Sequence, residues 1–279
     1  MVQHVVFIAS LLHSGSTVLD LLMGGHPRFV GLGEIAHVLQ PGPKGLEKTS
    51  RLLCSCNAKM DNCIFWGKVA SELRRNDNLG AEERYQIVLD TFEKVFGRDR
   101  TPVDSSKYIR PLQAIRRNPH VTDLKVLFVI KDVRAFTVSR LDRAKGKGGQ
   151  LKNRTPAYHF LSWYFRNKRI KNFLRKEKIP HLQIGYEELC LSPNHMIQKI
   201  CDFLGEKPEL SMLSLKDSRS HVIRGNRMRL QPDKRQGIFY DNRWFYRREW
   251  LLCALLFPNI MRFNEREVYN NGAGNIWTQ

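Results

Sequence analysis

Long apolar runs are absent from this sequence. No window approaches the roughly 18 apolar residues that a membrane-spanning helix needs, and the longest apolar stretch, residues 250–258, has about half that length. The N-terminus lacks a basic segment followed by an apolar core, so we expect no signal peptide. Cysteine is scarce, with 6 residues in 279, which favours free thiols in a reducing, cytoplasmic compartment. These absences predict a soluble protein with no transmembrane segment.

The common nucleoside-triphosphate loop is absent as well, because no Gly-x4-Gly-Lys-Ser/Thr motif occurs. Disorder is excluded, since apolar residues make up 42% of the chain and aromatic residues 10%. The sequence shows no internal repeat and no linker that would divide it. We therefore expect a single domain over residues 1–279, with an irregular, cysteine-containing insertion at about 41–64.

Acidic side chains are in deficit, with 27 Asp and Glu against 46 Lys and Arg, a net charge of +19. Residues 1–139 hold 19 basic and 14 acidic side chains, whereas residues 140–279 hold 27 and 13. The excess thus lies in the second half and calls for an anionic partner. The basic residues are not interleaved with aromatic stacking positions, so nucleic acid is not the expected partner.

Short apolar runs alternate with helical patterns along the chain. Strands are expected at residues 4–10, 101–104, 125–130 and 181–186. Helices are expected from residue 18 to the glycines at 24–25, from about residue 134 onward, and at about 65–75, 82–96, 155–176, 192–205 and 244–257. This alternation predicts an α/β fold of three layers, P-loop-like, with a mostly parallel central sheet flanked by helices.

The first strand is followed by Ser14-Gly15-Ser16-Thr17 and then by a helix. The glycine allows close approach of a ligand to the backbone, and the N-terminus of a helix favours an anion. Two readings stay open for this segment alone, a phosphate-binding turn and an ordinary turn with a helix cap.

Two blocks of residues resemble a known family. The segment His13-Ser14-Gly15-Ser16-Thr17, with His26-Pro27 and Gly33-Glu34 after it, resembles the 5′-phosphosulfate loop of sulfotransferases that depend on 3′-phosphoadenosine 5′-phosphosulfate (PAPS). The block Lys131-Asp132-Val133-Arg134-Ala135, with Ser139 after it, resembles their 3′-phosphate motif. Glu34 stands where tyrosylprotein sulfotransferases have a catalytic Glu. One C-terminal segment and one cysteine-containing segment resemble segments of bacterial members of the family.

The resemblance implies in-line transfer of a sulfonate from PAPS to a hydroxyl of a small metabolite, lipid or carbohydrate, with 3′,5′-ADP as product and no metal. It implies that Ser14, Gly15, Ser16 and Thr17 hold the 5′-phosphate and sulfonate. Lys131, Ser139 and Arg143 would hold the 3′-phosphate, with Tyr186 and Arg229 as further candidates. Glu34 would be the general base, and His13 and Lys107 would stabilise the leaving oxygen.

Two residues depart from the family pattern: His13 replaces an Arg or Lys, and Lys131 replaces an Arg. A lysine keeps the charge but loses the two-pronged contact of a guanidinium. A histidine is only partly protonated near neutrality, which predicts a decline in turnover as pH rises past its pKa.

Alternatives remain for the function and for the cysteines. Sulfation of a protein tyrosine, or a nucleotide-dependent kinase with an atypical loop, would also use an anion-binding turn. The acceptor, its possible negative charge and the oligomeric state are not encoded in a recognisable pattern. Cys54, Cys56 and Cys63 lack the paired Cys-x2-Cys spacing of a strong zinc site and have no fourth ligand nearby in sequence, so a disulfide or simple packing is expected instead.

Overall fold

A central sheet organises the computed structural model, which describes residues 3–40, 45–76, 78–145, 155–269 and 276–277. The strand order is β2-β3-β1-β4-β5-β6, in which the first five strands are parallel and β6 pairs with β5 antiparallel. The strands are β1 (Gln3–Ser10), β2 (Phe29–Gly33), β3 (Thr101–Lys107), β4 (Val121–Ile130), β5 (His181–Gly185) and β6 (Ile276–Trp277). The predicted mostly parallel α/β sheet is confirmed.

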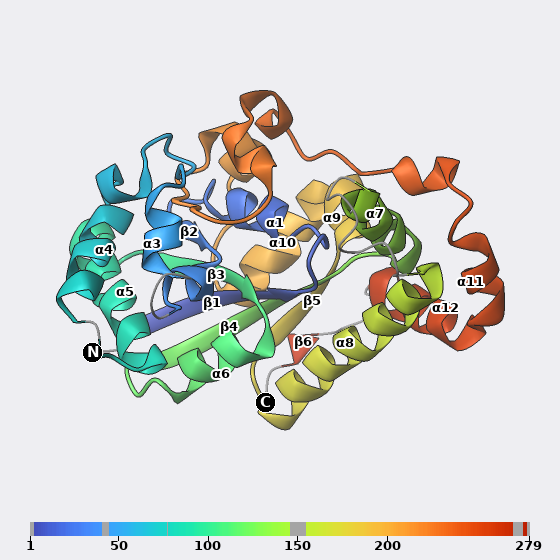
Figure 1. The fold of residues 1–279 in the computed structure, drawn as a ribbon, viewed down its shortest axis with the longest axis horizontal. Helices are drawn as coiled ribbons and strands as arrows, with labels where there is room; N and C mark the ends of the chain where they lie inside the picture. The colour runs from blue at the N-terminus through green and yellow to red at the C-terminus, as the bar shows by residue number, and fades with distance from the viewer. Residues whose placement is uncertain (1–2, 41–44, 77, 146–154, 270–275, 278–279) are drawn as a thin grey trace.

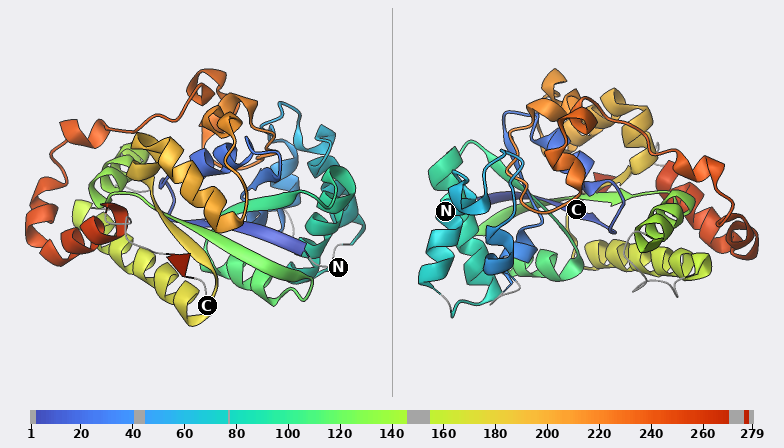
Figure 2. Two further views of the ribbon diagram at one scale, coloured as in Figure 1. Left: turned by 180° about the vertical axis from the view of Figure 1, so that it is seen from behind. Right: turned by 45° about the horizontal axis from the view of Figure 1, so that its top comes forward.

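Helices cover both faces of this sheet (Figures 1 and 2). The α-helices are α1 (Ser16–Met23), α2 (Ile35–Val38), α3 (Leu46–Ser50), α4 (Trp66–Arg75), α5 (Ala81–Phe96), α6 (Ile109–Arg117), α7 (Val133–Lys145), α8 (Pro156–Lys176), α9 (Tyr186–Leu191), α10 (Pro193–Leu204), α11 (Leu251–Leu256) and α12 (Pro258–Asn264). Short 3-10 turns include η2 (Met60–Asn62), η5 (Arg227–Leu230) and η7 (Arg243–Tyr246), and a π-turn, η8, spans Glu265–Tyr269.

The side chains of each strand alternate between the two faces of the sheet and so divide the hydrophobic core into two clusters. Val5 and Phe7 of β1 pack with α4, α5, α6 and α8, while Val6 and Ile8 pack on the opposite face with α1, α9 and α10. Successive side chains of a strand point to opposite faces, so continuous apolar strands such as β1 and β4 are buried on both sides. Figure 1 shows the result, with α1 and α10 above the sheet and α6 and α8 below it.

The chain turns outward at the same edge of the sheet after each parallel strand. β1 leads into the Ser14–Thr17 turn, Glu34 follows β2, Lys107 ends β3, Lys131 follows β4, and Tyr186 follows β5. After β1 the chain crosses to β2, which lies on one side of β1 in the sheet. β4 lies on the other side of β1, so the direction in which strands are added reverses at β1. In open parallel sheets, ligands bind outside the carboxyl ends of the strands at such a reversal.

Two features of the local structure differ from expectation. β2 was not predicted, because its short glycine-containing sequence has no clear strand pattern. The single helix expected at 244–257 is wrong: η7 and α11 replace it, and Pro258 begins α12. Arg134 lies 4.2 Å from the ring centre of Trp244 and 5.5 Å from that of Trp250, contacts that hold a turn there.

The described part of the cysteine-containing segment holds α3, η2 and an antiparallel bridge between Leu53 and Lys59. Its residues 41–44 lie outside the described ranges. Among the helices that the structure describes, none combines the length and apolar character required to cross a membrane.

Candidate active site

The turn after β1 has a left-handed backbone at two positions. His13 has φ 71° and Gly15 has φ 91°, and Gly15 caps α1. A Cβ on residue 15 would lie 2.2 Å from Cδ2 of Tyr186, so both the conformation and the space require glycine. The N–H groups at the start of α1 have no acceptor within the helix and point out of its N-terminus. The turn is therefore built to receive an anion.

The other residues of the turn are buried against the protein: Ser14, Ser16 and Thr17 expose 8% of their surface or less. The hydroxyl of Thr17 accepts a hydrogen bond from the backbone N–H of Asn226, at 3.1 Å. The C-terminal half of the chain thus contacts the first turn of α1, and Gly225 beside it has a left-handed backbone, with φ 146°.

Glu34 and Lys107 form a buried ion pair between the ends of two neighbouring strands. The ammonium of Lys107 donates to Oε1 of Glu34, and Nε2 of His37 lies 3.0 Å from Oε2. Burial alone would raise the pKa of Glu34, but the His37 hydrogen bond and the Lys107 charge lower it to about 2. Both oxygens of Glu34 are engaged, and the carboxylate is ionised at neutral pH.

Lys131 lies on the other side of the turn, where β4 ends. Its ammonium is 3.3 Å from Oδ2 of Asp241 and 4.6 Å from the ring centre of Tyr186, the ring that packs on Gly15. Burial opposes ionisation of Asp241, yet Arg243 and Lys131 hold the pKa of that carboxyl well below its usual range. Lys131 and Tyr186 therefore border the turn directly.

His13 stands among cations. Its Nδ1 is 3.3 Å from the hydroxyl of Ser139 on α7. Burial, together with the charges of Arg140, Arg143, Lys131 and Lys107, lowers its pKa to about 4. The imidazole is neutral near pH 7, so the expectation of partial protonation at neutrality is wrong.

Arg229 lies on the Glu34 side of the site. Burial lowers the pKa of its guanidinium, while the charges of Cys54 and Glu34 oppose that shift. One of its nitrogens donates to the carbonyl of Ile223 at 2.7 Å, and its Nε is buried with no hydrogen-bond partner in the structure as described. Its charge interactions are with Cys54, Glu34 and Arg224.

Three residues of the site were not found from the sequence. His37 follows Glu34 by three positions, a helical spacing that gives a usable signal. Arg140 adjoins Ser139 on α7. Asp241 has no local signal, because it reaches Lys131 from a segment 110 residues away.

The structure decides between the two alternatives left open for the cysteines. All six are free thiols, so no disulfide joins Cys54, Cys56 or Cys63. His221, which the sequence separates from them, lies against two of them, with its Nδ1 3.2 Å from Sγ of Cys63 and 3.9 Å from Sγ of Cys54.

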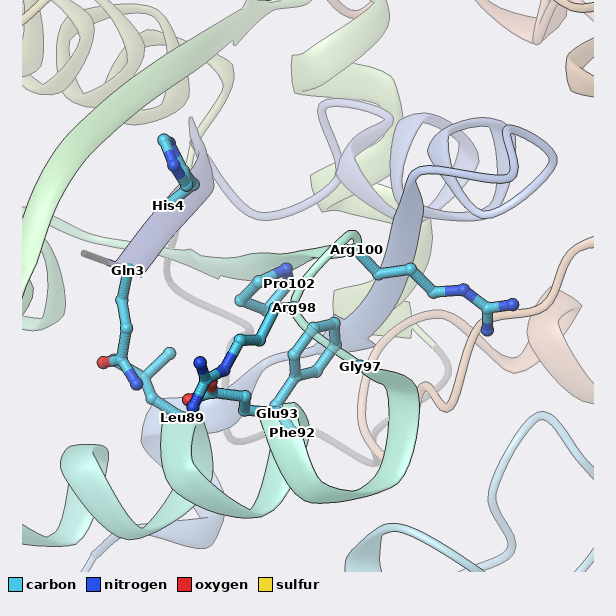
Figure 3. Close-up of a pocket in the computed structure, with 9 residues that line it drawn as sticks. All are labelled: Gln3, His4, Leu89, Phe92, Glu93, Gly97, Arg98, Arg100 and Pro102. Carbon is cyan, nitrogen blue, oxygen red and sulfur yellow. The ribbon is translucent and has the colours of Figure 1, made fainter. Parts of the chain in front are cut away.

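A cavity of about 150 Å³ lies away from this site. It is lined by Gln3 and His4 at the start of β1, by Arg98 and Pro102, and by side chains of α5 (Figure 3). These residues surround the amino ends of β1 and β3, opposite the edge where Glu34, Lys107 and Lys131 gather. The cavity is therefore separate from the candidate active site.

Comparison with known proteins places the chain in a family and a fold. The model of the sulfotransferase family matches residues 5–209. The fold is similar to the sulfotransferase domain of the olefin synthase of Synechococcus PCC 7002, with 19% identity, coverage of 96% of this chain and 95% of the other, and a TM-score of 0.54.

Two further structures share the fold. The sulfotransferase domain from the curacin biosynthetic pathway has 22% identity, coverage of 88% and 86%, and a TM-score of 0.51. Sulfotransferase STF1 of Mycobacterium tuberculosis H37Rv has 14% identity, coverage of 79% and 72%, and a TM-score of 0.50. No curated protein matches the sequence. Because the family model spans well over half of the chain, from β1 to the end of α10, the protein belongs to the sulfotransferase family and is an enzyme that transfers sulfate.

Proposed function

We propose that the protein transfers the sulfonate of PAPS to a hydroxyl group of a small metabolite, lipid or carbohydrate. One observation carries the choice of donor: the charges of Lys107, Lys131, Arg140 and Arg143 converge on His13, beside a helix N-terminus whose glycine has no room for a side chain. PAPS brings several negative charges, on a 3′-phosphate and a 5′-phosphosulfate, and cations with backbone N–H groups are the strong way to hold them.

The residues on the two sides of the turn would hold different parts of the donor. Ser14, Gly15, Ser16 and Thr17 would bind the 5′-phosphosulfate through backbone N–H groups and hydroxyls. Lys131, Ser139 and Arg143 would bind the 3′-phosphate. PAPS itself supplies an activated sulfonate, and 3′,5′-ADP is the leaving group. Tyr186 fixes this arrangement by packing on Gly15 and under Lys131.

Glu34 would accept the proton of the acceptor hydroxyl. In the unliganded protein it is a weak base, because Lys107 and His37 stabilise its ionised form. An anion at the turn would compete for Lys107, and a Glu34 that has lost this cation has a higher pKa and is a better proton acceptor. Lys107 would then stabilise the charge that develops on the leaving oxygen. His13, neutral and next to Ser139, would contribute a hydrogen bond rather than a full charge.

Incubation with sulfur-labelled PAPS and a library of hydroxyl acceptors tests this function. Transfer to metabolite, lipid or carbohydrate hydroxyls is expected without added magnesium. Label on tyrosine peptides alone would move the acceptor to protein tyrosine. Transfer of the γ-phosphate of ATP, with none from PAPS, would replace the proposal with a kinase.

A further inference from the structure

Four side chains that the site does not use converge in one place. Sγ of Cys54, Cys56 and Cys63 and a ring nitrogen of His221 all lie within 4.8 Å of one another. The three cysteines come from the loop and turn before α4, and the histidine comes from a segment more than 150 residues later. Cys54, Cys63 and His221 are buried, whereas Cys56 is exposed.

The separations between these atoms fit a common tetrahedral centre. Zinc–sulfur bonds of about 2.3 Å and zinc–nitrogen bonds of about 2.0 Å require sulfur–sulfur edges of about 3.8 Å and sulfur–nitrogen edges of about 3.5 Å. The distance from Cys63 Sγ is 3.8 Å to Cys54 Sγ and 3.8 Å to Cys56 Sγ. Nδ1 of His221 is 3.2 Å from Cys63 Sγ and 3.9 Å from Cys54 Sγ, which brackets the expected edge. A disulfide, at about 2.05 Å, fits none of these sulfur pairs.

Backbone N–H groups reach all three sulfurs of the cluster. The N–H of Cys56 reaches Sγ of Cys54, that of Ala58 reaches Cys56, and those of Phe65 and Trp66 reach Cys63. Hydrogen bonds of this kind favour the thiolate, the form of cysteine that binds a metal. Asn57, with φ 67°, closes the tight turn that aims Cys54 and Cys56 at the same point.

We propose that Cys54, Cys56, Cys63 and Nδ1 of His221 form a structural zinc site. Three sulfurs and one imidazole in a tetrahedron are a donor set that selects zinc, and four protein ligands leave no open position for catalysis. The exposed Cys56 gives the ion a route in from solvent.

The site would clamp a segment that touches the anion-binding turn. Residues beside the cluster already connect the two segments: Ser55 N–H donates to the carbonyl of Val222 at 3.0 Å, and the indole of Trp66 donates to the carbonyl of His221 at 2.5 Å. Five residues after His221, the N–H of Asn226 bonds to Thr17 of the turn. Zinc would therefore fix the 221–226 segment against α1 and β2, where His221 N–H also bonds to the carbonyl of Gly31.

Metal analysis of the whole protein, purified without a polyhistidine tag, tests this site. Equimolar zinc is expected in the wild type and its loss is expected in Cys56→Ser, a substitution at an exposed position that leaves the core intact. Cys253→Ser, at a buried cysteine outside the cluster, is the matched control and should keep its zinc. Chelation should lower the Tm of the wild type and of Cys253→Ser, and leave that of Cys56→Ser unchanged.

Cobalt gives a readout that does not depend on how well a variant folds. Addition of Co²⁺ to chelator-treated wild type should produce the intense visible bands of a tetrahedral thiolate site. A wild type that is metal-free after growth with zinc and gives no such bands overturns the proposal. Zinc retained equally by Cys56→Ser also overturns it. Neither result bears on donor binding at the turn, which is measured separately.

Discussion

Two buried lysines border the anion-binding turn, and their carboxylate partners differ. Lys107 pairs with Glu34, whose side chain is 10% exposed, whereas Lys131 pairs with Asp241, whose side chain is 26% exposed. Glu34 binds Lys107 at the end of β3 and the nearby His37 in α2. Asp241 binds Lys131 and also Arg243. The carboxylate on the Lys107 side is therefore the more enclosed of the two and that on the Lys131 side the more open. This difference fits the proposed proton transfer at Glu34 and the proposed binding of the 3′-phosphate at Lys131.

The largest expected effect tests the enclosed side. Glu34→Gln should lower kcat by about 10²–10⁴-fold, because a positioned base contributes on that order, while 3′,5′-ADP binding stays within a few-fold. Glu47→Gln, at an exposed carboxylate of α3, is the control and should be fully active. Labelled-sulfonate transfer and calorimetry separate the two readouts. A Glu34→Gln enzyme with an unchanged kcat would show that Glu34 is not the general base.

The turn lies between the Lys107 side and the Lys131 side, so a substitution in it should affect both sides of the site. Gly15→Ala places a methyl group against Tyr186 and should abolish detectable 3′,5′-ADP binding. Gly205→Ala is the matched control, because Gly205 has a similar φ of 80° but open space around it. The control should lose only the roughly 1–2 kcal/mol of a left-handed alanine. The role of the Tyr186 contact would be contradicted if both variants lost the same free energy of unfolding in chemical denaturation and bound 3′,5′-ADP equally well.

On the open side, Lys131→Met should weaken 3′,5′-ADP binding by about 10–100-fold, the value of one charge-assisted hydrogen bond. Binding of 5′-AMP, which has no 3′-phosphate, should change much less. Calorimetric titration of both nucleotides measures the difference. Equal losses for the two would place Lys131 elsewhere than at the 3′-phosphate.

Asp241→Asn sharpens the same result. It removes the anion that competes for Lys131, so 3′,5′-ADP should bind a few-fold more tightly even as the unliganded protein loses stability. Weaker binding would mean that Asp241 supports the donor site rather than competing with it.

The smallest effect concerns His13, which lies between the two lysines. Its pKa, about 4 when folded and 6.5 in the unfolded chain, means that the unfolded state binds more protons between these values. Its contribution to stability is therefore lost as pH falls through this window, by at most about 2 kcal/mol at pH 5. Urea denaturation at pH 7 and 5 should show a smaller acid loss for His13→Gln than for the wild type.

Most of the fold and the strand-end residues could be predicted from local patterns. The apolar β1 and β4 and the Ser14–Thr17 turn are each encoded within a few neighbouring positions. The basic residues at the ends of β3 and β4 were identified through the resemblance to the sulfotransferase motifs. β2 could not be found that way, since Phe29–Gly33 owes its strand to pairing with β3. Asp241 and His221 could not be assigned either, because each meets its partners through the path of an irregular C-terminal segment.

Calorimetric titration of the wild type with 3′,5′-ADP and with ATP tests the central claim most directly. The account predicts equimolar binding of 3′,5′-ADP, stronger than that of 5′-AMP and far stronger than that of ATP, without added metal. Tight, magnesium-dependent binding of ATP with no binding of 3′,5′-ADP would contradict it.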